Sequence, residues 1–423
     1  MTIQTYLHQP KVSSTLLINE QSALMEKSGQ DIYRFGFGQS PFSPPKFLQD
    51  ELAAHRHEHG YLPIQGLAEL REAVADFHKK NQNLDYSADE VYIGPGSKQL
   101  IFNVLALFKK ARVYLPAPTW VSYEPQCDIL NHDTHYIEST YETNWRLTPE
   151  LLEAELSKTA NDEKANIIIL TYPGNPTGLT YSGPELEGLA AVLKKYNVLV
   201  ISDEIYGCLT FNRSHQSIAK YYKEQTIITT GLSKWCGAGG WRVGTALVPK
   251  ALGSDFHTAL SGIGSETYSS HASPIQYAAI EAYNNDESLT FINQQIDVLS
   301  VLGKWCSDQL NNNNVRVHAP EGAFYLWIDF SQFKTALQAK GINDSAKLCE
   351  KLLSDAGVAL LPGTAFGMKK DLYVARLAYV NFDGNKTLEA VANGKTVDES
   401  FVKELCPRVV TGIERINQFV NAL

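Results

Sequence analysis

The stretch Thr226-Ile227-Ile228-Thr229-Thr230-Gly231-Leu232-Ser233-Lys234 joins an apolar run to a lysine, and Gly240-Trp241-Arg242-Val243-Gly244 follows shortly after it. The apolar run is rich in β-branched residues, which is typical of a buried strand. The intervening Gly237-Ala238-Gly239-Gly240 predicts a loop that lies close to another group. A lysine and an arginine across such a loop indicate a binding site, whereas two neighbouring cations elsewhere are usually a solvated face.

Outward from this stretch, short apolar strands alternate with amphipathic helices from about residue 45 to 285. The predicted strands are Val91–Gly94, Arg112–Pro116, Thr134–Glu138, Asn166–Pro173, Val198–Asp203, Thr226–Gly231 and Trp241–Val248. Helical patterns separate most of them, for example at Gly66–Lys80, Ser97–Lys109 and Gly183–Tyr196. This alternation predicts an α/β large domain with a mostly parallel seven-stranded sheet flanked by helices.

The pattern changes after a long predicted helix at Ser288–Asn311. Beyond it, strands are predicted at Val315–His318, Phe324–Phe330, Val358–Pro362 and Tyr373–Val380, with helices near Asp344–Ala356 and Glu399–Ala422. We therefore expect an N-terminal helix (Ser14–Lys27) and arm over 1–45 that join the small domain, a large domain over 46–290 and a smaller α+β domain over 291–423. The polar, glycine-containing stretch Asp383–Asp398 is interpreted as an exposed insertion.

Composition narrows the class of protein. The 423 residues are 44% hydrophobic and 20% charged, as in ordinary globular proteins. A net charge of -9 argues against a nucleic-acid partner, and no apolar run approaches the roughly 20 residues of a membrane span. The start of the chain, Met1–Thr5, lacks the features of a secretory signal, and the six cysteines lack metal-ligand or disulfide spacing. We expect a cytoplasmic protein with reduced thiols and no metal, and interpret Cys236 as a small residue near the site.

The polar residues of interest stand at predicted strand ends, where open parallel sheets bind ligands. Asp203 ends an apolar strand and needs a partner, which a protonated pyridine nitrogen would supply. Lys234 is placed to form a Schiff base, and Arg242 to clamp a phosphate. The turn Gly94-Pro95-Gly96-Ser97-Lys98 opens a helix and could present amides to an anion. Together with Tyr206 and Asn175, this set predicts pyridoxal phosphate as the cofactor.

From about Gln30 to the C-terminus the chain resembles the class I/II pyridoxal-phosphate-dependent aminotransferases of fold type I, the group that includes aspartate aminotransferase. The ordered motifs that carry the resemblance are Tyr61-Leu62-Pro63-Ile64, Gly66-Leu67-Ala68-Glu69-Leu70-Arg71, Gly96-Ser97-Lys98-Gln99, Asn175-Pro176-Thr177-Gly178, Asp203-Glu204-Ile205-Tyr206, Ser233-Lys234 through Gly244, Glu321-Gly322-Ala323-Phe324-Tyr325, Leu361-Pro362-Gly363, Phe366-Gly367 and Arg376-Leu377-Ala378-Tyr379. Each motif alone is weak, and the ordered set is specific.

The resemblance implies a role for each matching residue. Lys234, Asp203 and Tyr206 are the catalytic residues: Lys234 is the Schiff-base lysine and proton carrier, Asp203 pairs with the pyridine nitrogen, and Tyr206 binds the ring oxygen with Asn175. For the phosphate, the resemblance implies Gly96, Ser97, Lys98, Ser233 and Arg242. Trp120 would stack on the ring, Tyr61 would reach the phosphate of a neighbouring subunit in a homodimer, and Arg376 would bind the substrate α-carboxylate near Gly38.

Three features depart from the family pattern. Gly231 stands where many relatives carry a serine, so one phosphate hydroxyl is absent. The arm reads Gly38-Gln39-Ser40-Pro41-Phe42 instead of the common Gly-Glu-Pro-Asp-Phe. The stretch Asp383–Asp398 is also long for the family.

The expected reaction is ping-pong transfer of an amino group between an L-amino acid and a 2-oxo acid. Lys98 resembles a lysine that meets a distal carboxylate in some aspartate and prephenate aminotransferases, which indicates aspartate or glutamate as the donor; aromatic or broad specificity is the alternative. A C–S β-lyase or a synthase on the same scaffold is the alternative, because the cofactor supports all of these outcomes. A regulatory module would need a DNA-binding domain ahead of this fold, whereas only about 30 residues precede the arm.

Overall fold

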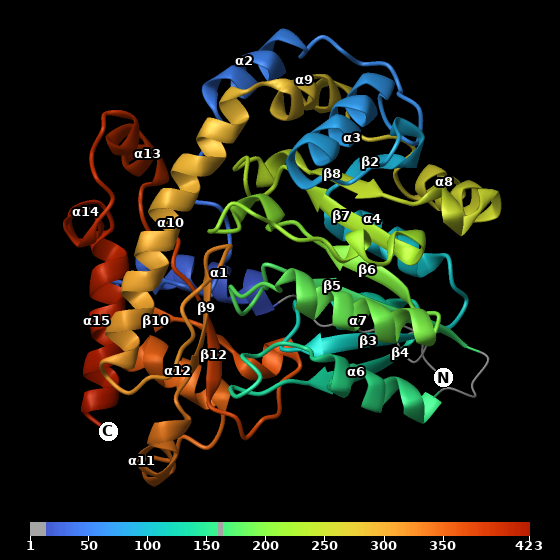
Figure 1. Cartoon of the computed structure of the whole chain (residues 1–423). Helices are drawn as coiled ribbons and strands as arrows, with labels where there is room; N and C mark the ends of the chain where they lie inside the picture. The colour runs from blue at the N-terminus through green and yellow to red at the C-terminus, as the bar shows by residue number, and fades with distance from the viewer. Residues whose placement is uncertain (1–13, 160–163) are drawn as a thin grey trace, which may run out of the picture.

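The computed structural model describes residues 14–159 and 164–423. Its centre is a seven-stranded sheet in the order β2-β8-β7-β6-β5-β3-β4 (Figure 1). The strands are β2 Val91–Pro95, β3 Ala111–Ala117, β4 Asp133–Glu138, β5 Ala165–Thr171, β6 Leu199–Asp203, β7 Thr226–Gly231 and β8 Val243–Leu247. Only β8 runs antiparallel to its neighbours among these strands. The predicted mostly parallel sheet is confirmed, although Trp241 lies in a 3-10 turn ahead of β8.

Helices cover both faces of this sheet because side chains alternate along each strand. On one face Ile168 and Val200 pack under α6 and α7. On the other, Ile167 and Ile201 pack under α4, α5 and α8. The bounds of these helices are α4 Ser97–Ala106, α5 Tyr123–Ile129, α6 Pro149–Leu156, α7 Gly183–Lys195 and α8 Ser254–Tyr268.

Three further helices, α2 Lys46–Ala54, α3 Ala68–Gln82 and α9 Ser273–Asn284, lie together at the β2 end of the sheet (Figure 1). The helix α10 Glu287–Asn311 then runs along the molecule to a second, smaller sheet. Because α10 begins at Glu287, the predicted domain limit at 291 falls inside its first turns.

The smaller sheet is antiparallel, in the order β11-β12-β9. Its strands are β9 Tyr325–Asp329, β11 Leu361–Pro362 and β12 Val374–Ala378. The arm joins this part of the molecule because β1 Tyr33–Arg34 pairs with β10 Val358–Ala359. The remaining helices there are α1 Ser14–Lys27, α11 Lys334–Ala339, α12 Ser345–Ala356, α13 Gly384–Ala392, α14 Glu399–Leu405 and α15 Pro407–Asn421.

The predicted strand at Val315–His318 is wrong. Only Arg316 forms a bridge, with Asp329. The Asn311 side chain binds both the backbone N–H and the backbone C=O of Val317, at 3.1 and 2.9 Å, so these groups have no need of a neighbouring strand. The Glu399–Ala422 helix is also divided in two, at Pro407, since proline has no N–H to continue a helix.

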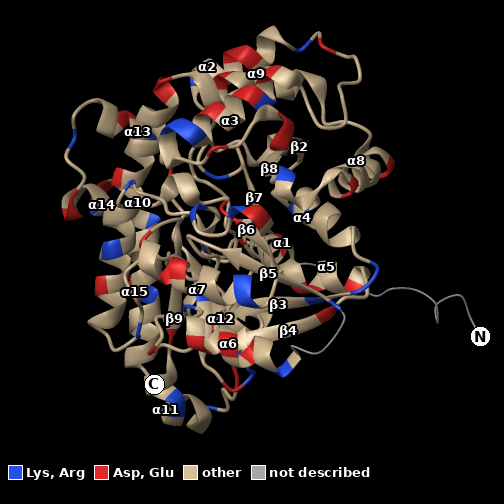
Figure 2. Cartoon of the chain, turned by 45° about the vertical axis from the view of Figure 1, so that its right-hand side comes forward, with Lys and Arg blue, Asp and Glu red and all other residues tan. Residues whose placement is uncertain are grey.

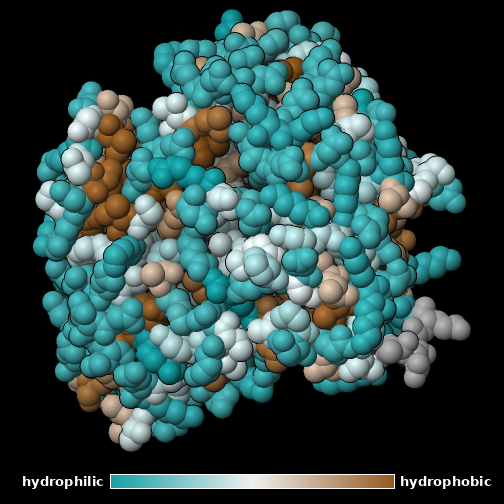
Figure 3. Space-filling model, in the orientation of Figure 1, coloured by the Kyte–Doolittle hydropathy of each residue, from teal (hydrophilic) through white to brown (hydrophobic). Residues whose placement is uncertain are grey.

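The stretch Asp383–Asp398 is mostly exposed, as predicted, but much of it is the helix α13 and not an irregular insertion. Asp383 caps this helix by accepting a hydrogen bond from Lys386 N at 3.2 Å. Leu388 and Val391 pack against the core beside α10. Apolar surface is visible on the side of the molecule where α10, α13 and α14 lie (Figure 3).

We propose the division into 1–45, 46–290 and 291–423 as domains, supported by the seven-stranded sheet and the three-stranded sheet, which share no strand. Charged side chains of both signs are scattered over the surface (Figure 2). Within the described residues, no helix is long and apolar enough to cross a membrane. The start of the chain, with Met1–Thr5, lies outside those residues.

Candidate functional site

A cavity of about 600 Å³ lies at the edge of the large sheet where its parallel strands end. The topology brings the side chains there, because β2, β3, β5, β6 and β7 all point the same way. The residues that follow or end these strands and line the cavity are Ser97, Lys98, Trp120, Asn175, Asp203, Tyr206, Ser233 and Lys234. The antiparallel strand β8 begins at the same edge, which places Arg242 in the wall.

The small sheet and the arm close the other side of the cavity. Tyr325 comes from β9, Arg376 from β12, and Gly38 from the arm. Every site residue predicted from the sequence lines this cavity except Gly96 and Tyr61. Gly96 lies against the Arg242 guanidinium, next to the cavity wall. Tyr61 lies away from the cavity lining and is 93% exposed.

Lys234 presents its amine to the cavity and donates a hydrogen bond to Gly38 O at 2.8 Å. The amine also lies 5.5 Å from the Tyr206 ring centroid. Burial, followed by the positive charges of Arg376 and Arg242, lowers the pKa of Lys234 to about 8. About a tenth of this amine is therefore neutral at pH 7, far more than for an ordinary lysine, and the neutral form is what a nucleophile or a proton acceptor requires.

Asp203 is 3% exposed, and the charge of Lys234 lowers its pKa less than the hydrogen bonds that the carboxylate accepts. Its Oδ2 accepts a hydrogen bond from the Tyr123 hydroxyl at 2.7 Å, and Oδ1 accepts a longer one from Thr229 at 3.4 Å. Burial raises the pKa of Asp203 to about 6, against the lowering effect of these donors. A cation placed beside this carboxylate would be favourable.

Arg376 is 1% exposed and is held in place on two sides. It donates to Asn175 Oδ1 at 2.9 Å and to Gly36 O at 2.5 Å, and its guanidinium lies 4.8 Å from the Tyr325 ring centroid. Its Nε has no hydrogen-bond partner among the described residues. A buried guanidinium with a spare donor and no carboxylate partner is suited to bind an anion that enters the cavity.

The anion pocket is formed by the helix α4 N-terminus, Ser97 and Arg242. Arg242 donates to Gly239 O at 2.8 Å, which fixes the side chain across the glycine-rich loop. A Cβ on Gly96 would lie 2.1 Å from Arg242 Nη2, and one on Gly244 would lie 2.3 Å from Ser97 N. These glycines let β8 and Arg242 approach the helix N-terminus closely, where backbone amides and the helix dipole favour a negative charge.

Lys98 adds another cation to the same cavity. Its amine lies 5.0 Å from the Trp120 ring centroid, a cation–π distance. Burial and the charge of Arg242 both lower the pKa of Lys98. The cavity thus gathers Lys98, Lys234, Arg242 and Arg376 around Asp203, although the whole chain carries a net charge of -9.

Sequence reasoning missed two tyrosines of the cavity. Tyr123 binds Asp203, and Tyr325 places its hydroxyl 2.6 Å from that of Tyr206. Tyr325 stands in the motif Glu321–Tyr325, which carries no local signal of a contact with Tyr206. Cys236 is fully buried outside the cavity lining, and burial raises the pKa of its thiol, which disfavours the reactive thiolate.

The departure at Gly231 has a physical cause. A Cβ on Gly231 would lie 2.3 Å from Val243 O, and its φ of 151° also favours glycine, so a serine does not fit here. A Cβ on Gly38 would lie 2.0 Å from the Tyr325 hydroxyl. The arm is therefore pressed against the cavity through Gly38, and Gln39 also lines it.

These residues fit pyridoxal phosphate as a group. The buried carboxylate of Asp203 has a raised pKa, a fraction of the Lys234 amine is neutral, and the glycine cradle beside Arg242 leaves a place for an anion. A pyridine nitrogen, an aldehyde and a phosphate are the three complementary groups.

The sequence profile described as "Aminotransferase class I and II" matches residues 30–385. An aspartate aminotransferase of Bacillus subtilis is 32% identical over 87% of this chain and 91% of its own length. A probable aspartate/prephenate aminotransferase of Rickettsia felis is 33% identical, over 87% and 90%. The solved structure of Thermus thermophilus aspartate aminotransferase with maleate superposes with a TM-score of 0.79 at 27% identity, over 90% of this chain and 97% of that one. The chain therefore belongs to the class I and II aminotransferases, which are pyridoxal-phosphate-dependent enzymes of the aspartate aminotransferase fold.

Proposed function

We propose that this aminotransferase accepts an acidic L-amino acid, aspartate or glutamate, and passes the amino group to a 2-oxo acid in a ping-pong sequence. The observation that carries the proposal is Lys98, which adds a cation to the cavity that already holds Arg376. One guanidinium is enough for an α-carboxylate, and a further cation favours a second carboxylate. The names of the relatives, and the dicarboxylate maleate in the Thermus structure, support the same class of substrate.

Arg376 is proposed to bind the α-carboxylate of the amino acid. Its contacts with Asn175 and Gly36 fix the plane of the guanidinium before substrate arrives. A planar fork that is already oriented loses little conformational freedom on binding. The arm residue Gly38 lies against the hydroxyl end of the Tyr325 ring and would border the same carboxylate.

The cofactor supplies, when bound, an electron sink for the charge that develops at the substrate α carbon. We assign Asp203 to its ring nitrogen, Trp120 to the ring face, and Tyr206 with Asn175 to the ring oxygen. We assign the binding of the phosphate to Arg242, Ser97, Ser233 and the backbone around Gly96, with Lys98 nearby. The raised pKa of Asp203 supports this arrangement, because a protonated ring nitrogen would favour the charged carboxylate.

Lys234 is proposed to hold the cofactor covalently and to move the proton at the substrate α carbon. Its position, 2.8 Å from Gly38 O, places the amine on the arm side of the cavity. With a pKa near 8, Nζ can accept the proton and give it back close to neutral pH. Removing Lys234 should therefore affect both cofactor attachment and proton transfer.

We also propose a homodimer with shared active sites and a cytoplasmic location. Tyr61 supports the dimer, because a tyrosine exposed by 93% is available to contact the phosphate site of a second copy. Six cysteines in the free thiol state support the location. Cell fractionation and light scattering of the purified protein would test these two points.

The substrate proposal is tested by mixing cofactor-loaded protein with one amino acid at a time and following the visible absorbance in a single turnover. Aspartate and glutamate should react. In Lys98→Met we expect their KM to rise about 10- to 100-fold, the value of a charged hydrogen bond, with aromatic donors unchanged. Lys80→Met, at an exposed lysine outside the cavity, is the matched control.

Aspartate and glutamate remaining unreactive while aromatic amino acids bleach the band would overturn the assignment of Lys98. The products separate transfer from lyase chemistry. A new 2-oxo acid with the carbon skeleton of the donor indicates transfer, whereas pyruvate and a thiol from a cysteine conjugate indicate β-elimination.

A further inference from the structure

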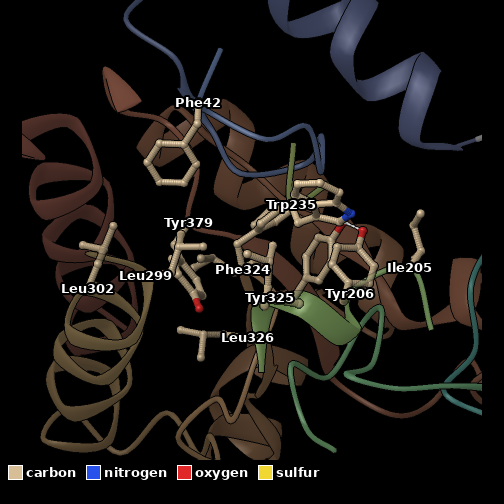
Figure 4. Packing of buried hydrophobic residues seen from close by; sticks show 14 of the residues in the cluster. Phe42, Ile205, Tyr206, Trp235, Leu299, Leu302, Phe324, Tyr325, Leu326 and Tyr379 are labelled. Atoms are coloured by element: carbon tan, nitrogen blue, oxygen red, sulfur yellow. Dashed lines mark hydrogen bonds between the residues drawn. The ribbon is translucent and has the colours of Figure 1, made fainter. Parts of the chain in front are cut away.

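Tyr325 stands at the centre of a short chain of hydrogen-bonding groups inside the cavity. Its hydroxyl lies 2.6 Å from the Tyr206 hydroxyl and 3.5 Å from Gly38 O. The same Gly38 O accepts the hydrogen bond from Lys234 Nζ. Figure 4 shows the two tyrosine side chains pointing their hydroxyls toward one another.

Packing leaves the Tyr325 ring little freedom. The residue is 1% exposed, and its ring meets that of Tyr206 edge-on at 5.5 Å between centroids. The Arg376 guanidinium lies on the Tyr325 ring, and Gly38 is so close that a Cβ there would be 2.0 Å from the hydroxyl. Because the oxygen is fixed, only the direction in which its proton points can change.

Each phenol has one proton to donate, so the chain has two arrangements. In the first arrangement, Tyr206 donates to Tyr325, and Tyr325 donates to Gly38 O; in the second, Tyr325 donates to Tyr206. If Tyr206 donates to the ring oxygen of the cofactor, its own oxygen becomes an acceptor, and Tyr325 must turn its proton toward Tyr206. Burial raises the pKa of both phenols, so both keep their protons at neutral pH.

We propose that Tyr325 is a positioning residue that reverses its hydrogen bond when the cofactor binds, and thereby strengthens the donation from Tyr206 to the ring oxygen. A hydroxyl that accepts a hydrogen bond is a better donor, since such bonds polarise one another. The same reversal withdraws a donor from Gly38 O and so links the arm to the cofactor. The inference rests on the proposed role of Tyr206.

The charged groups that face this chain come from several elements. Arg376 on β12 covers the Tyr325 ring, Lys234 after β7 shares Gly38 O, and Asp203 at the end of β6 interacts with both Lys234 and Tyr206. A change from tyrosine to phenylalanine at position 325 alters none of these charges, which makes it a clean test of the hydroxyl.

The test is the pKa of the Lys234–cofactor linkage, measured as the pH dependence of the visible absorption of the loaded protein. A hydrogen bond to the ring oxygen lowers this pKa, because it reduces the negative charge near the linkage nitrogen. Tyr325→Phe should raise it by about a tenth to a third of the rise in Tyr206→Phe, because Tyr325 only strengthens the hydrogen bond that Tyr206 donates. In Tyr206→Phe the further change Tyr325→Phe should have no effect, because the coupling acts through Tyr206.

Tyr373→Phe is the matched control. It removes another buried hydroxyl, bonded to Ile342 O at 3.1 Å, and should leave the spectral pKa unchanged. Replacement of Tyr325 by 3-fluorotyrosine keeps the hydroxyl but makes it a stronger donor, so the spectral pKa should fall. Because the expected shift of the spectral pKa has the opposite sign, the proposal stays testable even if the phenylalanine variant does not fold.

An unchanged spectral pKa in Tyr325→Phe, alongside a raised one in Tyr206→Phe, would overturn the role of Tyr325 alone. If Tyr206→Phe itself leaves the pKa unchanged, the proposed role of Tyr206 fails first. Shifts that add in the double variant would show that Tyr325 acts independently of Tyr206, which also contradicts the relay.

Discussion

Burial moves the pKa values of two residues at the centre of the cavity toward each other, that of Asp203 to about 6 and that of Lys234 to about 8. For the lysine, the nearby Arg376 and Arg242 act in the same direction as burial. Both groups therefore carry their charges at a cost, which a cationic ring nitrogen and a covalent attachment to the amine would relieve. The site is chemically incomplete without a partner for Asp203.

The pH dependence of Asp203 gives the first prediction. Because the folded-state pKa is raised, the contribution of this carboxyl to stability is fully present below its unfolded pKa of about 3.8 and is lost as pH rises through about 6. Cofactor-free protein should lose about 2 kcal/mol from this group between pH 4 and pH 7. Asp203→Asn should remove this slope, as measured by urea unfolding at several pH values.

Loading with pyridoxal phosphate should flatten the same slope in the wild-type protein, because a cation beside the carboxylate restores a lower pKa. The raised pKa would be contradicted if the free energies of unfolding of the cofactor-free wild type and of Asp203→Asn differed by the same amount at pH 4 and pH 7. Asp133→Asn, at an exposed edge where lysines lower the pKa of the carboxyl, is a control with the opposite sign.

At the level of single residues, the sequence places the polar side chains at strand ends, and strand ends converge in any open parallel sheet. Asp203, Asn175 and Lys234 were found in this way. Tyr123 and Tyr325 were not, because their contacts join positions 80 and 119 residues apart and depend on how α5 and β9 pack. Local periodicity carries no information on such pairs.

At the scale of elements, the contact between β8 and the start of α4 shapes the anion pocket. A Cβ on Gly244 would lie 2.2 Å from Gly96 C and 2.3 Å from Ser97 N, both backbone atoms that cannot move aside cheaply. Gly244→Ala should therefore destabilise the protein by about 1–3 kcal/mol and weaken cofactor binding by moving the helix N-terminus. Thermal unfolding and equilibrium titration with pyridoxal phosphate measure the two effects.

Gly262→Ala is the matched control for this substitution. Gly262 lies within α8 without a positive φ, and a Cβ added there would meet no atom within 4 Å, so alanine should stabilise the helix by about 0.5–1 kcal/mol. Tighter or unchanged cofactor binding in Gly244→Ala would show that the close approach does not shape the pocket.

Element boundaries are predictable where the local pattern is strong. The strand at Thr226–Gly231 has the predicted limits, because a buried β-branched run ends at a glycine. The strand at Val315–His318 fails because a side chain, Asn311, takes over the backbone hydrogen bonds that a strand would make. The helix over 384–392 was hidden by its polar composition, although Asp383 is a favourable cap.

At the scale of the whole molecule, the strand order β2-β8-β7-β6-β5-β3-β4 depends on crossovers that no local pattern specifies. The sequence predicts seven strands and a mostly parallel sheet, and only the structure shows the order. Local sequence patterns do not predict whether two copies of the chain associate. Tyr61 is the residue through which the proposed dimer can be tested. Its 93% exposure leaves it free for a partner.

Mixed dimers give the prediction at this scale. Tyr61→Ala should weaken cofactor binding and lower activity, and Lys234→Ala should be inactive. Co-refolding the two variants should recover activity, because one site of the mixed dimer then combines an intact Lys234 with an intact Tyr61 from the other chain. Recovery no greater than the sum of the two separate variants would contradict shared sites.

All of the proposed chemistry depends on attachment of the cofactor to Lys234, which is tested by reducing the loaded protein with borohydride and locating the cofactor by mass spectrometry of its peptides. The visible absorption band should vanish on reduction, and the added mass should lie on the peptide that contains Lys234. Lys234→Ala should show neither the band nor the modified peptide. A band that survives in Lys234→Ala, or a reduced cofactor attached to Lys98, would contradict the assignment.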